Sequence, residues 1–157
     1  MESNKACPCE PLDKPILRQF LKDYGDNLPD EVIEQALQDL NTWVTRCDCA
    51  DPSKLLGVGH YERNDWYLCT LKAVAVDAKE RQKGYGKETV GKLTELAASD
   101  PHCKVLAADI TCTNIPSIKS FKRAGFSQVG RFCWQKGEEP ADIVHLILYP
   151  PVDEKCP

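Results

Sequence analysis

A glycine-containing hexamer, Arg81–Gly86, stands between two segments of different character. The apolar run 71–76 before it has the composition of a buried strand, and residues 87–98 after it carry apolar side chains at helical spacing. A strand that ends in a glycine turn and opens a helix directs several backbone N–H groups toward one spot. Because the helix dipole also favours an anion there, the hexamer predicts a phosphate-binding turn.

The spacing of the glycines excludes two common phosphate-binding motifs. No Gly-Lys-Ser/Thr follows the hexamer, as a P-loop would require. Gly86 is followed by Gly91, five residues on, so the dinucleotide-binding fingerprint is absent as well. An ordinary strand-to-helix connection that uses glycine for left-handed positions is the alternative at this stage.

Nine cysteines are a large number for a chain of 157 residues. Their odd count, and the lack of an apolar signal-like core at the start of the chain, favour reduced thiols. We therefore expect Cys69, Cys112 and Cys133 to behave as small hydrophobic residues.

Two cysteine pairs stand apart from the others, Cys7 with Cys9 and Cys47 with Cys49. Four thiols in two close pairs are enough for a tetrahedral zinc ion, although a C-x-C spacing is tighter than zinc sites usually have. The sequence leaves three alternatives for these four residues: a zinc site, disulfides or free thiols. No metal ligand is assigned.

Length and charge limit the class of protein. We expect one domain over residues 1–157, with an irregular segment or short strand over 1–10 and a tail over 150–157. The formal net charge of −4 argues against nucleic-acid binding. No apolar run approaches the roughly 20 residues that span a bilayer. We therefore expect no membrane segment and a cytoplasmic location.

The periodicity of apolar residues predicts the elements that position the turn. Two helices come first, one capped by Asp13 with Pro15 in its first turn, and one opened by Asp30. Strands are expected over residues 42–47, 55–62, 66–76, 105–110, 127–134 and 142–149, and further helices over 87–98 and 114–125. This order implies an α/β (α+β) fold, in which about four helices flank a mixed, mostly antiparallel sheet of about six to seven strands.

Three features, in this order, resemble the GNAT superfamily of acetyl-CoA-dependent N-acetyltransferases. Val76 and the hexamer 81–86 match that family's strand end and its R/Q-x-x-G-x-G/A motif. Asn114 follows the fifth strand, where the family places an asparagine, and the dipeptide Gly-Phe at 125–126 matches its helix exit. The resemblance covers residues 12–149.

The resemblance implies acetyl-CoA as co-substrate, bound in a V-shaped opening between the fourth and fifth strands. The pantetheine arm is expected along the backbone of Val74 and Val76, as an added strand. The pyrophosphate is expected on backbone amides of the turn, namely those of Gln82, Lys83, Gly84, Tyr85, Gly86 and Lys87. Asn114, Ser117 and Phe121 complete the expected cofactor-binding set.

The proton transfers have no assigned residue. Many relatives protonate the leaving thiolate with a tyrosine seven residues after the asparagine, and that position here is Phe121, which has no proton to donate. Water can serve instead, because a CoA thiol is fairly acidic. Some relatives use a glutamate base where this chain has Thr70. Glu62, His60 and Cys112 are the candidates for catalysis, with solvated, packing and buried structural roles as their alternatives.

We expect transfer of an acetyl group from acetyl-CoA to a primary amine of a small molecule or peptide, by direct attack of the neutral amine. The acidic balance favours a cationic acceptor, and a homodimer is left open. A non-catalytic acyl-CoA-binding or sensing domain is one alternative. A metal- or redox-responsive protein that uses the two C-x-C pairs is another.

Overall fold

The computed structural model describes residues 6–8, 13–25, 28–136 and 139–150. The strands are β1 (Ala6–Pro8), β2 (Trp43–Asp48), β3 (Leu55–Arg63), β4 (Leu68–Val76), β5 (Val105–Thr111), β6 (Ser127–Lys136) and β7 (Glu139–Leu148). The helices are α1 (Lys14–Tyr24), α2 (Asp30–Ala36), α3 (Tyr85–Ser99) and α4 (Ile115–Arg123), with short 3-10 turns η1 (Leu40–Thr42) and η2 (Ala78–Glu80). The tail expected after residue 150 lies outside the described residues.

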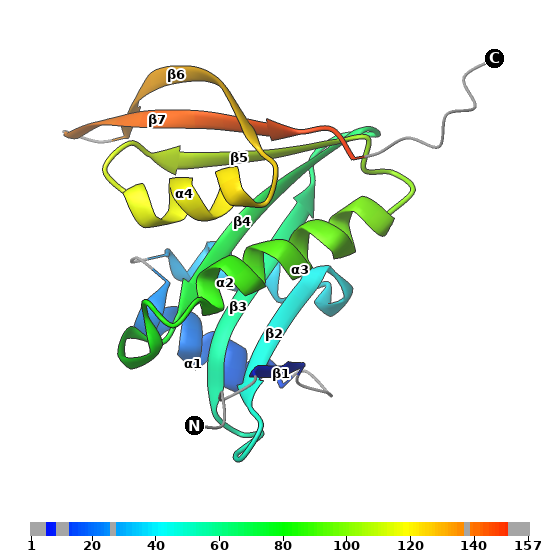
Figure 1. Ribbon diagram of the computed structural model, residues 1–157, viewed down its shortest axis with the longest axis vertical. Coiled ribbons are helices and arrows are strands. Elements are labelled where there is room, and N and C mark those ends of the chain that lie inside the picture. The colour runs from blue at the N-terminus through cyan, green and yellow to red at the C-terminus, as the bar shows by residue number, and fades with distance from the viewer. Residues whose placement is uncertain (1–5, 9–12, 26–27, 137–138, 151–157) are drawn as a thin grey trace.

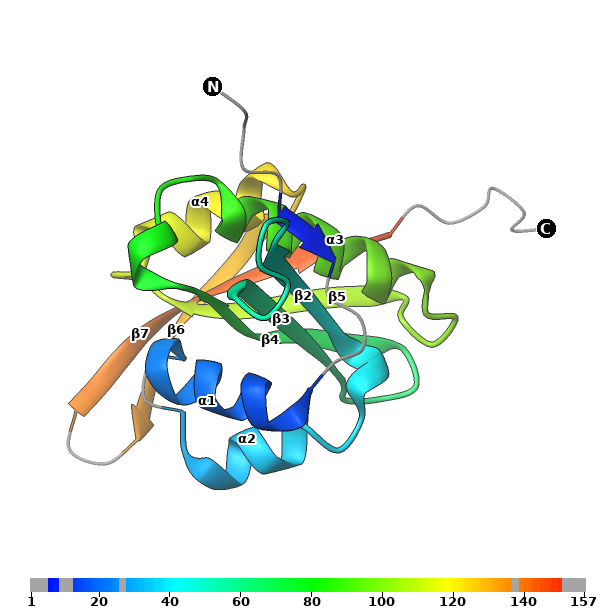
Figure 2. The ribbon, with the colours of Figure 1, turned by 90° about the horizontal axis from the view of Figure 1, so that it is seen from below.

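The strands form one seven-stranded sheet in the order β1-β2-β3-β4-β5-β7-β6. Neighbouring strands are antiparallel, except β4 and β5, which are parallel. α1 and α2 cover one face of the sheet, and α3 and α4 cover the other (Figures 1 and 2). The predicted mixed, mostly antiparallel sheet with flanking helices is confirmed.

Local signals in the sequence explain where the helices begin and end. The side chain of Asp13 accepts a hydrogen bond from the amide of Ile16 and caps α1. Asn114 caps α4 in the same way, by accepting from the amide of Ser117 at 3.3 Å. Gly125 ends α4 with a φ of 103°, in the left-handed region that glycine adopts without strain.

Two hydrophobic cores lie on opposite faces of the sheet. The core beneath α1 and α2 includes Leu17, Leu21, Ile33, Val58 and Ala75. The core beneath α3 and α4 includes Val90, Leu93, Leu106, Phe121 and Leu146. Since side chains alternate along a strand, a register slip of one residue would move the strand members of each core to the opposite face, and burial on both faces therefore specifies the register strongly.

The structure moves some predicted boundaries by a few residues. β4 begins at Leu68, because Trp66 is 76% exposed and its amide bonds to the Asp65 carboxylate in a turn. The last strand begins at Glu139, because its first residues pair with the end of β6 in a hairpin. α3 extends over Tyr85–Ser99 and therefore starts inside the glycine turn.

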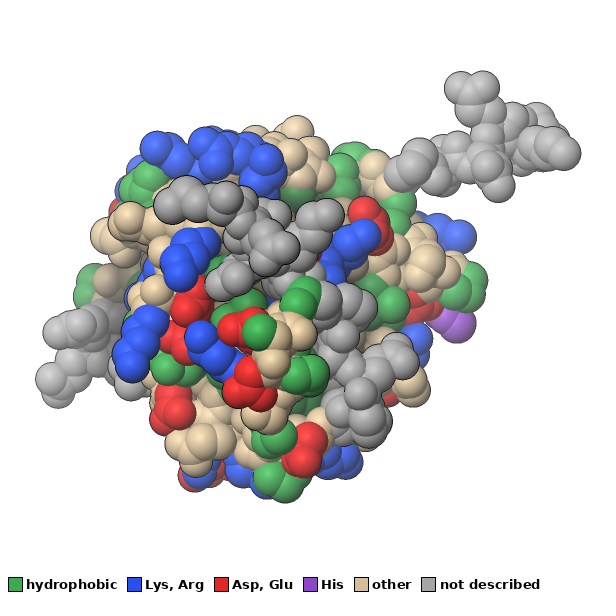
Figure 3. All heavy atoms as spheres, turned by 60° about the horizontal axis from the view of Figure 1, so that its bottom comes forward, with side chains coloured by type: hydrophobic (Ala, Val, Ile, Leu, Met, Phe, Trp, Pro, Cys, Tyr) green, Lys and Arg blue, Asp and Glu red, His purple; other side chains and the backbone are tan. Residues whose placement is uncertain are grey.

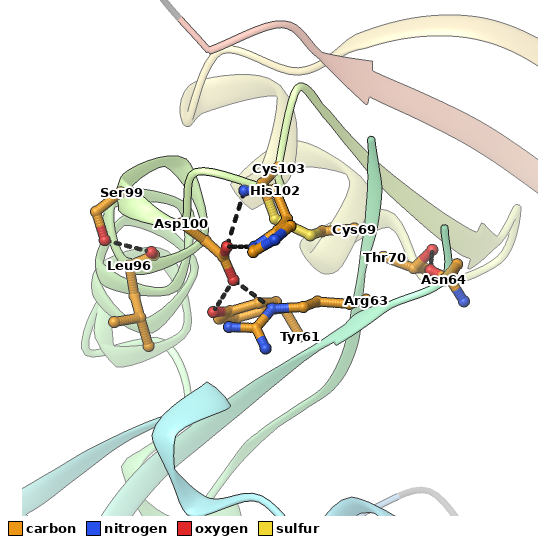
Figure 4. Close-up of a disulfide and its surroundings, with 10 residues drawn as sticks. All are labelled: Tyr61, Arg63, Asn64, Cys69, Thr70, Leu96, Ser99, Asp100, His102 and Cys103. Carbon is orange, nitrogen blue, oxygen red and sulfur yellow. Dashed lines mark hydrogen bonds and ion pairs between the residues drawn. A yellow bond between two sulfur atoms is a disulfide. The ribbon is translucent and has the colours of Figure 1, made fainter. Parts of the chain in front are cut away.

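The expectation of reduced thiols is wrong for Cys69, which forms a disulfide with Cys103 (Figure 4). Both residues are buried, at 0% and 4% exposure. Cys112 is free and partly buried, which fits a small hydrophobic residue. Cys133 is free but exposed, so the expectation that it behaves as a small hydrophobic residue is wrong as well.

Cys47 and Cys49 are also disulfide-bonded. The zinc and free-thiol interpretations are therefore wrong for these two residues, since a sulfur in a disulfide is no thiolate ligand. The side chains of Cys7 and Cys9 lie outside the described part of the structure. Because disulfides persist mainly in oxidising surroundings, the cysteines give no support for a cytoplasmic location. None of the described helices combines the length and apolar character that a membrane crossing requires.

Candidate active site

β4 and β5 separate after a short parallel contact. They pair from Leu68 with Val105 to Thr70 with Ala107, whereas β4 itself continues to Val76. The two strands therefore form a wedge, closed where they pair and open toward the glycine turn (Figure 1). This wedge corresponds to the V-shaped opening that the sequence led us to expect.

A β-bulge bends β4 at the wedge. The pairing of β3 with β4 shifts between Gly59 and Tyr61, so that Lys72 and Ala73 both lie opposite His60. A bulge increases the local twist and turns the strand away from its neighbour. It also explains a lysine in an otherwise apolar strand, because the side chain of Lys72 is exposed at this point.

One cleft, here called the turn cleft, follows the open side of the wedge and has a volume of about 770 Å³. It is lined by the end of β4, the glycine turn and α4. The expected cofactor residues in its lining are Val74, Val76, Gln82, Gly84, Gly86, Lys87, Asn114 and Ser117. The structure thus brings together residues that stand up to 43 positions apart in the sequence.

The backbone of the turn is held in an unusual shape. Gln82 has a φ of 69° and Gly84 a φ of 88°, both in the left-handed region. Such strained non-glycine residues concentrate at binding sites, and alternating backbone conformations form anion-binding concavities. α3 makes its first intrahelical bond from the amide of Glu88 to the carbonyl of Gly84, so the amide of Lys87, for example, has no acceptor within the helix.

The turn cleft is strongly basic, although the chain as a whole carries a net charge of −4. Its described lining residues include four basic side chains and no acidic one. The four are Arg81, Lys87, Lys119 and Arg123. Among the described residues, none of the four forms an ion pair. Unpaired cations beside helix-terminal amides suit a ligand with several phosphates.

Two residues of α4, Lys119 and Arg123, had not been predicted for this site. They stand four residues apart, which places them on one face of the helix. That spacing is the signal in the sequence, but exposed cations at helical spacing are common. Figure 3 shows that Lys and Arg side chains are spread over one face of the molecule and gather at its upper left edge.

The second cleft, here called the central cleft, has a volume of about 1020 Å³. It lies between the sheet and the segment from the end of α1 to η1. Its titratable lining residues are Asp39, His60, Tyr61, Glu62, Arg63, Lys72 and Asp109. Val74, Ala75, Asn114 and Ser117 line both clefts. The two clefts therefore meet at the β4 bulge and the start of α4.

Phe121 lines the central cleft and not the turn cleft. It is 3% exposed, and its ring meets that of Phe126 edge to face, with centroids 5.2 Å apart. Two other members of the expected set, Lys83 and Tyr85, have side chains directed elsewhere: the Lys83 ammonium lies 2.6 Å from the Glu80 carboxylate, and Tyr85 is buried.

The catalytic candidates do not lie together. His60 and Glu62 both line the central cleft, on the same side of β3. Cys112 lines neither cleft, and its thiol is close enough to Arg131 to raise the pKa of that guanidinium, after the larger effect of Asp142. Thr70, at the position of a glutamate in some relatives, donates its hydroxyl to the side chain of Asn64.

A buried carboxylate supports the closed end of the wedge (Figure 4). Asp100 is 7% exposed and accepts hydrogen bonds from the Tyr61 hydroxyl at 3.0 Å, from Arg63, and from the amide of His102 at 3.0 Å. Burial by itself raises the pKa of Asp100, but these hydrogen bonds outweigh it and lower the pKa to about 2. Asp100 is thus ionised at neutral pH and ties β3 to the segment that leads into β5.

The parallel strands β4 and β5 thus form a wedge with a basic cleft, suited to phosphates, at its mouth, and a second cleft adjoins the first. Residues 11–126 match the acetyltransferase (GNAT) family. The chain belongs to this family and is therefore a GNAT-type acetyltransferase. No curated protein sequence matches the chain significantly.

Solved structures show the same fold at low sequence identity. The ribosomal-protein-S18-alanine N-acetyltransferase from Escherichia coli is 15% identical, with a TM-score of 0.75 over 98% of this chain and 97% of that one. NAA60 from Arabidopsis thaliana, in complex with acetyl-CoA, is 18% identical, with a TM-score of 0.73 over 92% and 98%. The spermidine/spermine N-acetyltransferase SpeG from Vibrio cholerae is 10% identical, with a TM-score of 0.69 over 93% of each chain.

Proposed function

We propose that this enzyme transfers the acetyl group of acetyl-CoA to the primary amine of a small molecule or peptide. The observation that carries the proposal is the junction of two clefts of different character at the β4 bulge. The basic turn cleft suits the phosphates of CoA, and the central cleft suits an amine. The reacting groups meet where Val74 and Asn114 line both.

In this proposal the cofactor lies along the turn cleft. Its pantetheine amides pair with the backbone of Val74 and Val76, which β5 leaves unpaired where the wedge opens. The pyrophosphate rests on the amides of the turn from Gln82 to Lys87. Lys119 and Arg123 add positive charge from the opposite wall.

The chemistry is a direct displacement at the thioester. The amine lone pair forms a bond to the carbonyl carbon, the carbon–sulfur bond breaks, and water takes the proton that the nitrogen loses. A backbone amide at the bulge stabilises the developing oxyanion. The CoA thiolate takes its proton from water, because Phe121 has none to give and a thiol needs no strong acid.

The lining of the central cleft supports a cationic acceptor. Asp39, Glu62 and Asp109 contribute three carboxylates, against the two cations of Arg63 and Lys72. An excess of carboxylates raises the local concentration of protonated amines. One similar structure is named as a ribosomal-protein-S18-alanine N-acetyltransferase and another as a spermidine/spermine N-acetyltransferase. The amines in these names are cationic when protonated.

A non-catalytic acyl-CoA-binding domain is the second candidate. It is favoured by Phe121 and Thr70, which occupy the two positions where relatives carry an acid and a base, and by the hydrogen bond that directs Thr70 to Asn64.

An assay of free thiol released from acetyl-CoA distinguishes the enzyme from the binding domain. It is run with spermidine and with a peptide that has a free alanyl N-terminus. The proposal expects thiol release that depends on the amine, with acetylated product confirmed by mass spectrometry. Tight binding of acetyl-CoA without turnover of either amine would favour the binding domain.

A further inference from the structure

His60 is a buried titratable side chain in the wall of the central cleft. It is 7% exposed and lies on β3, opposite the bulge of β4. Its neighbour Gly59 pairs with Val74, which lines both clefts. His60 therefore lies beside the point where the acetyl group and the acceptor are expected to meet.

The ring of His60 has unused hydrogen-bonding capacity. Its Nδ1 is fully buried and has no hydrogen-bond partner within the described structure. Since the residue lines the central cleft, a hydrogen bond from a ligand in the cleft would fall on the other ring nitrogen, Nε2. Burial lowers the pKa of His60 to about 4, so the imidazole is neutral near pH 7 and accepts a hydrogen bond from an amine.

Packing holds this ring in place. It lies against the indole of Trp43, with centroids 4.7 Å apart and an angle of 31° between the planes. The indole N–H of Trp43 donates to the carbonyl of Ala36 at 2.9 Å. Ala36 ends α2 and itself lines the central cleft. The imidazole is thus fixed by strand and helix, as a precise binding group requires.

Two charged groups act on His60, and a third stands nearby on the same strand. The Asp39 carboxylate raises its pKa and the Lys72 ammonium lowers it, both by less than burial does. Glu62 stands two residues along β3 on the same side, with its carboxylate 3.9 Å from the Lys72 ammonium. An amine that enters the cleft therefore meets a neutral nitrogen acceptor with carboxylates nearby.

We propose that His60 binds the acceptor amine, accepting a hydrogen bond from the amine nitrogen and orienting it toward the thioester carbonyl. The inference rests on the proposed acetyl transfer and adds the residue that orients the acceptor. His60 takes no proton in the reaction, because the proton lost by the nitrogen goes to water. Its contribution is to bind the amine in the orientation from which it attacks.

His60→Phe tests this directly, because it keeps an aromatic ring against Trp43 and removes both nitrogens. The variant also removes a buried nitrogen without a partner, so its melting temperature should equal or exceed that of the wild type. With spermidine and the alanyl peptide, KM for the amine should rise about tenfold or more, while KM for acetyl-CoA stays constant. His60→Gln, with a neutral amide, should recover part of the loss.

His102→Phe is the matched control, since its side chain is 67% exposed and lines neither cleft. Both of its KM values should equal those of the wild type. A folded His60→Phe enzyme with an unchanged KM for both amines would overturn the assignment, as would a rise in KM for acetyl-CoA alone. Failure of the wild type to acetylate any amine would instead overturn the proposed function and this inference with it.

A measurement on the wild-type protein gives a second test, which does not depend on whether a variant folds. The chain has three histidines, so the imidazole ¹⁵N resonances are few. Saturating amine, added to the complex with CoA, should shift the Nε2 resonance of one deeply buried histidine, His60. No change in any imidazole resonance at saturation would contradict the proposal.

Discussion

Cys69 and Cys103 join the beginning of β4 to the segment that leads into β5, at the closed end of the wedge between these strands. The two strands separate beyond this point, and their parallel pairing extends to Thr70 and Ala107. The crosslink therefore stabilises the paired ends of β4 and β5, beyond which the two strands separate. The Asp100 hydrogen bonds reinforce the same corner (Figure 4).

Loss of this disulfide should lower the stability of the fold. The two cysteines are 34 residues apart, and a crosslink of that length contributes about 2–4 kcal/mol to the free energy of unfolding. We expect a Cys69→Ala/Cys103→Ala variant to lose about that much in urea denaturation. Cys133→Ala, at an exposed free cysteine, is the control and should stay within about 0.5 kcal/mol of the wild type. Equal stability of the two variants would show that the crosslink has no such role.

Asp100 should make the protein sensitive to acid. Its pKa is about 2 in the folded chain and 3.8 ordinarily, so the unfolded chain takes up the proton first as the pH falls. The stabilisation is complete above about pH 4 and is lost toward pH 2, which corresponds to about 2 kcal/mol. Asp100→Asn should be less stable at neutral pH and should lack this part of the pH dependence. A parallel loss of stability in both proteins between pH 4 and pH 2 would refute the assignment.

His60 should act in a separate pH range. Its pKa falls from 6.5 to about 4 on folding, so the unfolded chain again binds the proton first. Stability should decrease as the pH falls from about 6.5 to about 4, by about 3 kcal/mol. His60→Phe should be free of this decrease, which thermal unfolding at a series of pH values would measure. A His60→Phe profile that follows the wild type across this range would contradict the burial argument.

Phe121→Tyr tests whether the leaving thiolate needs an acid. Because water is sufficient for a thiol, we expect kcat to change less than about threefold. Phe121 is buried against Phe126, so the added hydroxyl should also lower the melting temperature slightly. A rise in kcat of about tenfold or more would show that protonation of the thiolate limits the wild-type rate.

Apolar periodicity and capping residues carry most of the information about the fold. Asp13, Asn114 and Gly125 mark helix ends through hydrogen bonds and backbone angles that depend on near neighbours in the sequence. The glycine turn is predictable for the same reason. The start of β7 was missed because Glu139 belongs to the strand only through its hairpin pairing with Lys136.

Contacts between distant segments explain what the sequence did not reveal. The Cys69–Cys103 bond depends on the parallel register of β4 and β5, which no local pattern contains. Lys119 and Arg123 become part of the turn cleft because α4 packs beside the wedge, and their sequence pattern is that of any exposed helix face. The burial of His60 likewise results from Trp43, whose position depends on α2.

The position of acetyl-CoA on the glycine turn is the central claim, and Gly84 offers a matched pair of substitutions. A side chain at this position would meet no atom within 4 Å, and its φ of 88° is one that Asn and Asp tolerate better than other residues. Gly84→Asn and Gly84→Asp therefore differ mainly in charge.

The most direct measurement is the dissociation constant of acetyl-CoA for the wild type and these two variants, by isothermal titration calorimetry. We predict that Gly84→Asn binds more weakly than the wild type and that Gly84→Asp shows no measurable binding, because its carboxylate repels the pyrophosphate. Equal affinities for Gly84→Asp and Gly84→Asn would contradict the account, since the phosphates would then lie away from the turn.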